Sequence, residues 1–228
     1  MLVALVMGFS CGLPLLLTLS VLQAWMREEG VDLRVIGMMT LVGLTYTLKF
    51  MWAPVFDRFA LPILGRRRGW LLMAQIALAL AIAAMGAVHP GKNPWMVAVA
   101  AFFVTWFSAS QDIVVDAYRR EDLPDAELGL GSSFYINGYR IGMLLASGGG
   151  LIMADHVPFS VVYVTMAGCM LPGIVTTLLA PEPSMTAGAP RTLRDAIIDP
   201  LAEYFRRPGA LGILAFVLLY KIGDTMAS

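Results

Sequence analysis

The sequence predicts an all-α polytopic membrane protein, a bundle of about seven transmembrane helices, from three observations. The chain is 58% hydrophobic and 14% charged, whereas soluble domains are about half apolar and a quarter charged. Its apolar residues gather in continuous runs of about 20, the length at which a helix crosses a bilayer. These runs do not alternate with polar residues, so we expect helices, which satisfy their own backbone groups in lipid, and not strands.

Seven segments are long enough to span a membrane. They cover residues 2–25, 35–56, 70–88, 94–118, 128–154, 158–179 and 210–228. The first is too long for the core of a signal peptide and ends without a small-residue cleavage pattern, so we expect a span. Pro14 and Pro172 lie inside the first and sixth segments, where proline kinks a helix.

The basic residues of the loops predict the orientation. The loops on the same side as residue 1 hold ten Lys and Arg residues, and the opposite loops hold three, Arg27, Arg34 and Lys92. Because cytoplasmic loops carry the excess of positive charge, we expect a cytoplasmic N-terminus. The ten are Arg58, Arg66, Arg67, Arg68, Arg119, Arg120, Arg191, Arg194, Arg206 and Arg207.

The sixth loop differs from the others. Residues 181–208 are polar and begin rich in proline, and Leu193, Ile197, Leu201 and Phe205 then recur every four residues. That spacing predicts an amphipathic helix at the cytoplasmic surface, interrupted at Pro200. The expected organisation is a six-helix bundle over 1–180, a cytoplasmic linker over 181–208, and over 209–228 the first helix of a truncated second bundle. Secondary transporters are built from two such halves, so we expect a piece of a twelve-helix protein.

Composition and motifs disfavour other classes. The formal net charge is zero and no nucleic-acid-binding motif is present, so nucleic acid is not an expected partner. Cys11 and Cys169 lie in apolar runs and are interpreted as small hydrophobic residues without a disulfide. His89 and His156 lie far from any Cys or Glu cluster, so neither a metal nor a cofactor is expected. No zinc, nucleophile or phosphate-binding motif indicates an enzyme; a non-transporting scaffold stays open.

Ionisable residues inside the segments indicate a polar cavity, since such groups face a bundle interior or water. Ser108, Asp112 and Asp116 are four residues apart and share one helix face. Ser133, Asn137 and Arg140 form a second polar stripe on the fifth segment. The candidate residues for substrate binding or proton coupling are Tyr46, Lys49, Gln111, Asp112, Asp116, Asn137, Arg140, Lys221 and Asp224.

Each of these charges has a structural interpretation beside the functional one. Asp116 either pairs with a loop arginine or faces the cavity. Asp112 either forms a structural ion pair with Arg140 or Lys49 or couples transport to protons, because low dielectric favours the neutral form of a carboxyl group. Arg140 either braces the bundle or binds a carboxylate or phosphate.

Two other patterns concern packing and gating. Gly8 with Gly12 and Gly138 with Gly142 are small-xxx-small pairs that predict close helix contacts. The loop "DRFALPILGRRRG" places an acidic residue and several arginines at the cytoplasmic end. These residues either form a charge network at a gate or only anchor the loop inside. The gating candidates are Asp57, Arg58, Arg66 and Arg67.

Five stretches resemble the AmpG family of muropeptide permeases, a branch of the major facilitator superfamily. They are "GFSCGLPLLL", "YTLKFMWAPVFDR", "LGRRRGWLL", "SASQDIVVDAYR" and "LYKIGD", and together they cover nearly the whole chain. "QDIVVDAYR" is the most specific of them. The loop "DRFALPILGRRRG" also resembles the facilitator signature between the second and third spans, with a longer spacing between Arg58 and Gly65.

The resemblance implies a bundle of the major facilitator type and a multi-pass symporter of the bacterial inner membrane. It implies import of N-acetylglucosaminyl-anhydro-N-acetylmuramyl saccharides and peptides, driven by protons, for peptidoglycan recycling. The expected partners are this muropeptide, protons and the lipid bilayer, with the protein acting as a monomer. Eukaryotic acetyl-CoA transporters share a looser form of the stretches, so acetyl-CoA or another anionic metabolite is the alternative substrate.

Overall fold

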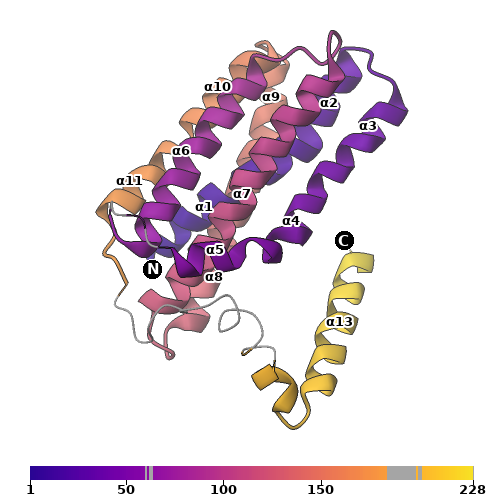
Figure 1. The fold of residues 1–228 in the computed structure, drawn as a ribbon. Helices are drawn as coiled ribbons and strands as arrows, with labels where there is room; N and C mark the ends of the chain where they lie inside the picture. The colour runs from indigo at the N-terminus through magenta and orange to yellow at the C-terminus, as the bar shows by residue number, and fades with distance from the viewer. Residues whose placement is uncertain (60, 62–63, 184–198, 200–201, 228) are drawn as a thin grey trace. The chain divides into compact units, whose positions relative to one another are not determined.

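The computed structural model describes residues 1–59, 61, 64–183, 199 and 202–227, with side chains up to residue 220. Two compact units, Met1–Thr186 and Ala187–Ser228, are considered separately. Every regular element in the described ranges is a helix, so the prediction of an all-α bundle is confirmed (Figure 1).

The first span is a continuous helix over Leu2–Glu28. It consists of α1 (Leu2–Leu16), a π-helical turn η1 (Leu17–Val21) and α2 (Leu22–Glu28). The π turn follows Pro14, whose missing N–H removes one bond of the helical ladder. The Thr18 hydroxyl donates to the carbonyl oxygen of Pro14 at 3.1 Å. Proline therefore changes the local helix type here without ending the span.

The second span ends earlier than predicted. It runs over Leu33–Met51 as α3 (Leu33–Met39), η2 (Thr40–Gly43), α4 (Leu44–Leu48) and η3 (Lys49–Met51). A separate helix, α5 (Ala53–Arg58), follows with Pro54 in its first turn. Because the residue before a proline disfavours the α conformation and proline lacks an N–H, the helix breaks there and not at Phe56.

The remaining helices form the rest of the bundle and one helix of the second unit. They are α6 (Arg66–Gly86), α7 (Pro94–Asp122), α8 (Leu128–Leu144), η4 (Leu145–Gly149), α9 (Gly150–Ala154), α10 (Phe159–Gly168), α11 (Leu171–Leu179) and α13 (Ala210–Ala227). α11 begins with Pro172 in its first turn, so the sixth predicted segment is divided at the proline. Most of the amphipathic helix predicted from Arg191 to Phe205 lies outside the described residues; residues 199 and 202–206 are helical.

Five helices of the described chain are long and apolar enough to cross a membrane, fewer than the seven expected. They are Leu2–Glu28, Leu33–Met51, Arg66–Gly86, Pro94–Asp122 and Phe159–Leu179. The segment 128–154 is helical throughout but is not among them. Its serines, Asn137 and Arg140 lower its hydropathy. The last predicted span contains a shorter apolar helix, Ala210–Tyr220.

Glycines hold the first and fifth spans together. A Cβ atom on Gly8 would overlap the carbonyl oxygen of Tyr135, and one on Gly138 would overlap that of Leu5. Gly12 and Gly142 meet backbone atoms in the same way. The two small-xxx-small patterns therefore face each other across α1 and α8, which confirms the predicted close contact.

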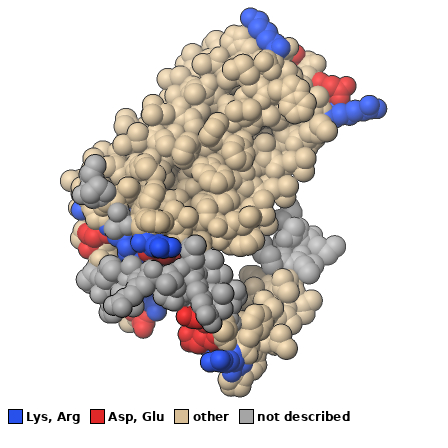
Figure 2. Space-filling view, viewed as in Figure 1, with Lys and Arg blue, Asp and Glu red and all other residues tan. Residues whose placement is uncertain are grey.

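The surface of the Met1–Thr186 unit is apolar between two charged ends. On the face seen in Figure 2, the charged side chains of this unit gather at its ends. Large hydrophobic side chains are exposed along its helices, among them Leu80, Phe103 and Leu144. Such an outward apolar belt is costly in water and favourable in hydrocarbon. The chain is therefore a multi-pass membrane protein.

Candidate functional site

A polar seam joins the second span to α7. The Tyr46 hydroxyl donates to Ser108 Oγ at 3.0 Å, and the Thr105 hydroxyl donates to Thr45 Oγ1 at 3.3 Å. Both α7 partners are buried. The α7 stripe found in the sequence thus faces a neighbouring helix, and hydrogen bonds within the seam offset the cost of burying its hydroxyl groups.

Nearer the C-terminal end of α7, Lys49 and Asp112 form a loose ion pair. Lys49 Nζ lies 3.9 Å from Asp112 Oδ2, and the two side chains are 35% and 10% exposed, respectively. That separation exceeds hydrogen-bonding distance. The other carboxylate oxygen, Asp112 Oδ1, is buried without a hydrogen-bond partner in the described part of the chain. Of the two partners considered for Asp112, the structure selects Lys49.

Gln111 extends the polar region toward α1. Its Nε2 donates to Cys11 Sγ at 3.1 Å, while its Oε1 is buried without a partner among the described residues. Cys11 therefore accepts a hydrogen bond, although the sequence indicated only a small hydrophobic residue. Buried acceptors without partners are uncommon in folded proteins and mark places for water or a ligand. Two such acceptors occur here on consecutive residues.

The other predicted site residues are not brought to this pair. Asp116 is exposed and pairs with Arg119 at 3.2 Å, as its structural interpretation expects. Arg140 and Asn137 are exposed on α8, and the Asn137 amide donates to a carbonyl of its own helix, that of Ser133, at 2.8 Å. The side chains of Lys221 and Asp224 lie outside the described residues.

A second charged cluster connects α5, α6 and α7 at the arginine-rich end. Arg67 donates to Asp57 at 2.8 Å and to Glu121 at 2.6 Å, and Arg66 donates to Glu121 at 2.7 Å. The Arg67 side chain is only 5% exposed. A buried guanidinium is stable only where carboxylates satisfy it, so Asp57 and Glu121 hold it in place.

Glu182, which follows α11 near the end of this unit, completes the cluster. Its carboxylate accepts the backbone N–H groups of Arg67 at 2.7 Å and Arg68 at 3.0 Å. These groups belong to the first turn of α6, where N–H groups lack helical partners and favour an anion. Gly65 precedes them with φ 89°, and a Cβ there would lie 2.6 Å from Glu182 Cδ.

The sequence analysis predicted Asp57, Arg66 and Arg67 of this cluster but not its two glutamates, Glu121 and Glu182. Glu121 and Glu182 were interpreted as ordinary loop charges, because each lies more than 50 residues along the chain from Arg66 and Arg67. Arg58 was grouped with the gating residues, yet its guanidinium lies 5.4 Å from the ring centre of Phe59 and pairs with none of the described carboxylates. The weak signal for Glu121 was its place in the last turn of a long helix.

Fold and site together define a class of protein: a multi-pass bundle of membrane helices with paired charges held within it, the architecture of membrane transporters. The chain matches the family described as the Major Facilitator Superfamily over residues 1–227. It belongs to that family of transporters.

Individual relatives agree with the expected branch. The chain is 46% identical over 226 residues to a protein of Escherichia coli K12 called anhydromuropeptide permease, covering 99% of this chain and 46% of that protein. It is 42% identical over 233 residues to an uncharacterized protein of Haemophilus influenzae, covering 100% and 55%. A putative transporter AmpG 1 of Rickettsia prowazekii is 32% identical over 176 residues, covering 75% and 40%. The resemblance to AmpG-type permeases is confirmed. The chain spans about half the length of the curated relatives it matches.

Proposed function

We propose that the protein acts as a proton-coupled secondary transporter that imports anhydromuropeptides for peptidoglycan recycling. It is a monomer in the bacterial inner membrane, with its N-terminus in the cytoplasm. The observation that carries the proposal is the Lys49–Asp112 pair, loose and largely buried, with one carboxylate oxygen that has no hydrogen-bond partner among the described residues. The 46% identity to an anhydromuropeptide permease supports the choice of substrate.

The pair offers a simple route to coupling. A proton taken up by Asp112 neutralises the carboxylate and removes its attraction for Lys49. The ammonium group, 35% exposed at its side chain, then becomes available to a carboxylate of the muropeptide. Release of the proton restores the pair and displaces the substrate. Proton and substrate binding are thereby linked through one charge, and each favours the other.

Neighbouring residues suit the rest of a muropeptide, which offers hydroxyls, amides and carboxylates. Tyr46 and Gln111 flank the pair, and Gln111 Oε1 is a buried acceptor without a partner in the described part of the chain. Asn137 and Arg140 are exposed on α8 and available to a ligand. We place the substrate against these residues. Asp116, Lys221 and Asp224 remain in the proposed set on the resemblance to the family alone.

The arginine-rich cluster is proposed as the cytoplasmic gate. Asp57, Arg66 and Arg67 tie the short helix α5 to the first turn of α6 through Glu121. An ion-pair network of this kind has two discrete arrangements, formed and broken, which is what alternating access needs. In this proposal Arg58 is left outside the gate, since it takes no part in the network.

Uptake measurements test the function. Labelled anhydromuropeptide is supplied to spheroplasts that lack their own permease and express the protein, with and without a proton uncoupler, and labelled acetyl-CoA serves as the competing substrate. We expect muropeptide uptake that the uncoupler abolishes, and no acetyl-CoA uptake. If muropeptide fails to accumulate although the protein reaches the membrane, the substrate assignment is wrong. Uptake that the uncoupler does not affect would instead contradict the proposed proton coupling.

A further inference from the structure

A continuous apolar groove runs along the outer seam between α6 and α7. One part encloses about 400 Å³ between the two helices, and a second part encloses about 250 Å³ where α5 joins them. Phe107 lines both parts, so they adjoin. Neither the polar seam of Lys49 and Asp112 nor the arginine cluster contributes a charged residue to this lining.

The sequence explains why a groove forms there. Ala74, Ala77, Ala81 and Ala84 line it from α6, at spacings of three and four that place them on one helix face. Alanine has no side chain beyond Cβ, so these four positions form a low floor beside the larger α6 side chains that also line the groove, Trp70, Met73 and Leu80. Bulky side chains from α7, including Phe103 and Phe107, form the opposite wall. They keep a second helix, about 10 Å across, away from the floor, whereas a single hydrocarbon chain fits.

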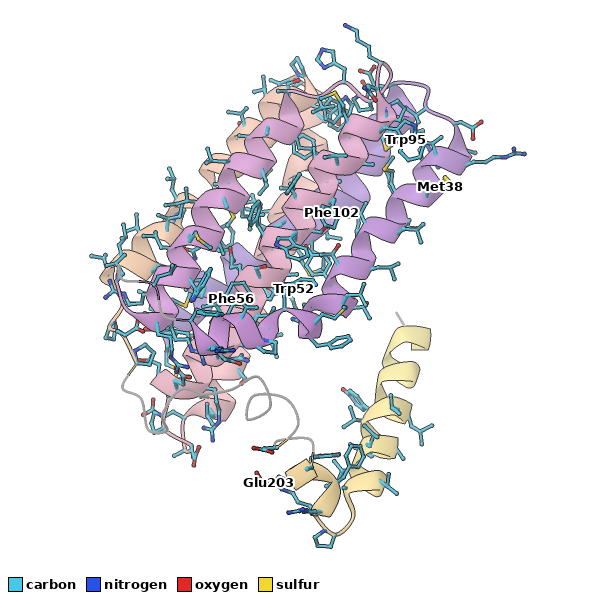
Figure 3. All side chains as sticks on the ribbon, in the orientation of Figure 1. Met38, Trp52, Phe56, Trp95, Phe102 and Glu203 are labelled. Atoms are coloured by element: carbon cyan, nitrogen blue, oxygen red, sulfur yellow. The ribbon has the colours of Figure 1, made fainter. Side chains whose placement is uncertain are left out.

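Aromatic residues line the groove at the arginine-rich end. Trp52 stacks on Trp106 with ring centres 4.2 Å apart, and Phe56 meets Trp70 edge-on at 4.9 Å. Figure 3 labels Trp52 and Phe56 on this face, where α5 contacts α6 and α7. Tryptophan is enriched where a membrane protein meets the lipid headgroups. Trp70 lies four residues after the start of α6, which places this end of the groove near headgroup level.

The length of the groove agrees with a lipid chain. From Trp70 to Ala84, helix α6 rises roughly 21 Å at about 1.5 Å per residue. One leaflet contributes half of a hydrocarbon core about 30 Å thick. A chain that enters at the tryptophans is therefore covered over its full depth in its leaflet.

One arginine beside this end of the groove has no carboxylate partner among the described residues. Trp70 Nε1 donates to the carbonyl oxygen of Phe59, and the neighbouring Arg58 is exposed, with its guanidinium above the Phe59 ring. Each of the other described arginines at this end of the Met1–Thr186 unit has at least one partner, although Arg66 Nε is buried without one. Arg66, Arg67, Arg119 and Arg120 pair with carboxylates, and Arg68 donates to two backbone carbonyls.

We infer that this groove is a binding site for one anionic glycerophospholipid: the groove between α6 and α7 takes an acyl chain, and Arg58 takes the headgroup phosphate. Guanidinium binds phosphate oxygens through two parallel hydrogen bonds, and neutralising the exposed charge at the membrane surface favours an anionic lipid over a zwitterionic one. The site depends on the membrane location of the chain and not on the transported substrate.

Native mass spectrometry tests the site. The protein is released from nanodiscs that contain equal amounts of phosphatidylglycerol and phosphatidylcholine, and the lipids that stay bound are counted. We expect one retained phosphatidylglycerol, preferred by about tenfold, as for one charge-assisted contact. Arg58→Gln should abolish the preference, and Ala81→Phe should abolish retention by filling the groove.

Matched variants serve as controls. Arg34→Gln removes an exposed arginine at the opposite end, and Val99→Phe enlarges an exposed residue that does not line the groove; both should bind as the parent does. The site is refuted if the parent retains no lipid, if Arg58→Gln keeps the preference, or if Ala81→Phe retains as much lipid as Val99→Phe. Conversion of a dimer into a monomer by Ala81→Phe would also refute it, by making the groove a contact between copies. This experiment measures bound lipid and not uptake, so a negative result would refute the lipid site and leave the transport proposal unaffected.

Discussion

The two charged clusters of the bundle differ in how fully their partners are satisfied. In the Arg67 cluster, three ion pairs have lengths from 2.6 to 2.8 Å, and Glu182 adds two hydrogen bonds to backbone N–H groups. In the Lys49–Asp112 pair, the single contact is 3.9 Å long and one carboxylate oxygen has no described partner. Several short ion pairs hold the helices of the Arg67 cluster together, whereas the unpaired oxygen of Asp112 leaves that carboxylate able to bind a further group.

Removal of Arg67 should produce the largest change in stability. Arg67→Met leaves Asp57 and Glu121 without their shared partner, and breaking a buried pair costs about 3 kcal/mol. We expect a marked loss of thermal stability, measured by fluorescence-detected gel filtration in detergent. Arg34→Met, at an exposed position with no described ion pair, is the control. Equal melting temperatures for the two variants would mean that the cluster does not hold the helices.

Alanine at position 65 tests the contribution of Glu182. Gly65 has φ 89° and ψ −175°, a conformation nearly confined to glycine, so Gly65→Ala should cost about 2 kcal/mol. The added Cβ also displaces the Glu182 carboxylate. The same melting assay measures the loss, with Gly129→Ala as the control because its Cβ meets nothing within 4 Å. An unchanged Gly65→Ala would show that Glu182 contributes little.

The loose pair should behave in the opposite way. Asp112→Asn removes the charge and the proton site, so uncoupler-sensitive uptake should fall about tenfold or more, equivalent to about 1.4 kcal/mol. Thermal stability should change little, since the pair is long and one oxygen is already unpaired. Asp125→Asn, at an exposed position, should transport as the parent does. Normal proton-driven uptake by Asp112→Asn would exclude Asp112 from the coupling mechanism.

A smaller effect is expected within the neutral part of the seam. Trp52 Nε1 donates to Ser110 Oγ at 3.2 Å, so Ser110→Ala leaves the indole N–H without its acceptor and should cost about 1 kcal/mol. Ser147, whose hydroxyl bonds only within its own helix among the described residues, provides the control Ser147→Ala. The difference in melting temperature between the two variants measures how much this hydrogen bond between Trp52, which directly precedes α5, and Ser110 of α7 contributes to stability. Equal melting temperatures would mean that the stacking of Trp52 on Trp106, and not the hydrogen bond, holds these segments together.

The helices themselves were largely predictable because hydropathy and proline are local properties. Four of the seven expected spans match long apolar helices within a few residues. Residues 35–56 end at Met51 because of Pro54. Segment 128–154 is helical but is not among the apolar spans, and the described part of the last segment contains a shorter apolar helix. Gly8, Gly12, Gly138 and Gly142 were also predictable as contact points, since small residues at spacings of four mark close approach in membranes. Which helices they join was not predictable, because the pattern carries no information about its partner.

The sequence by itself determined that the chain is a helical membrane protein, which residues stand out as polar within it, and to which family it bears a resemblance. The tertiary structure decided the partners: Lys49 and not Arg140 for Asp112, Glu121 for Arg67, and Glu182 for the start of α6. Glu182 and Arg67 are more than a hundred residues apart. Ion pairing depends on distances of a few ångströms, and between residues that far apart in sequence only the packing of helices sets those distances.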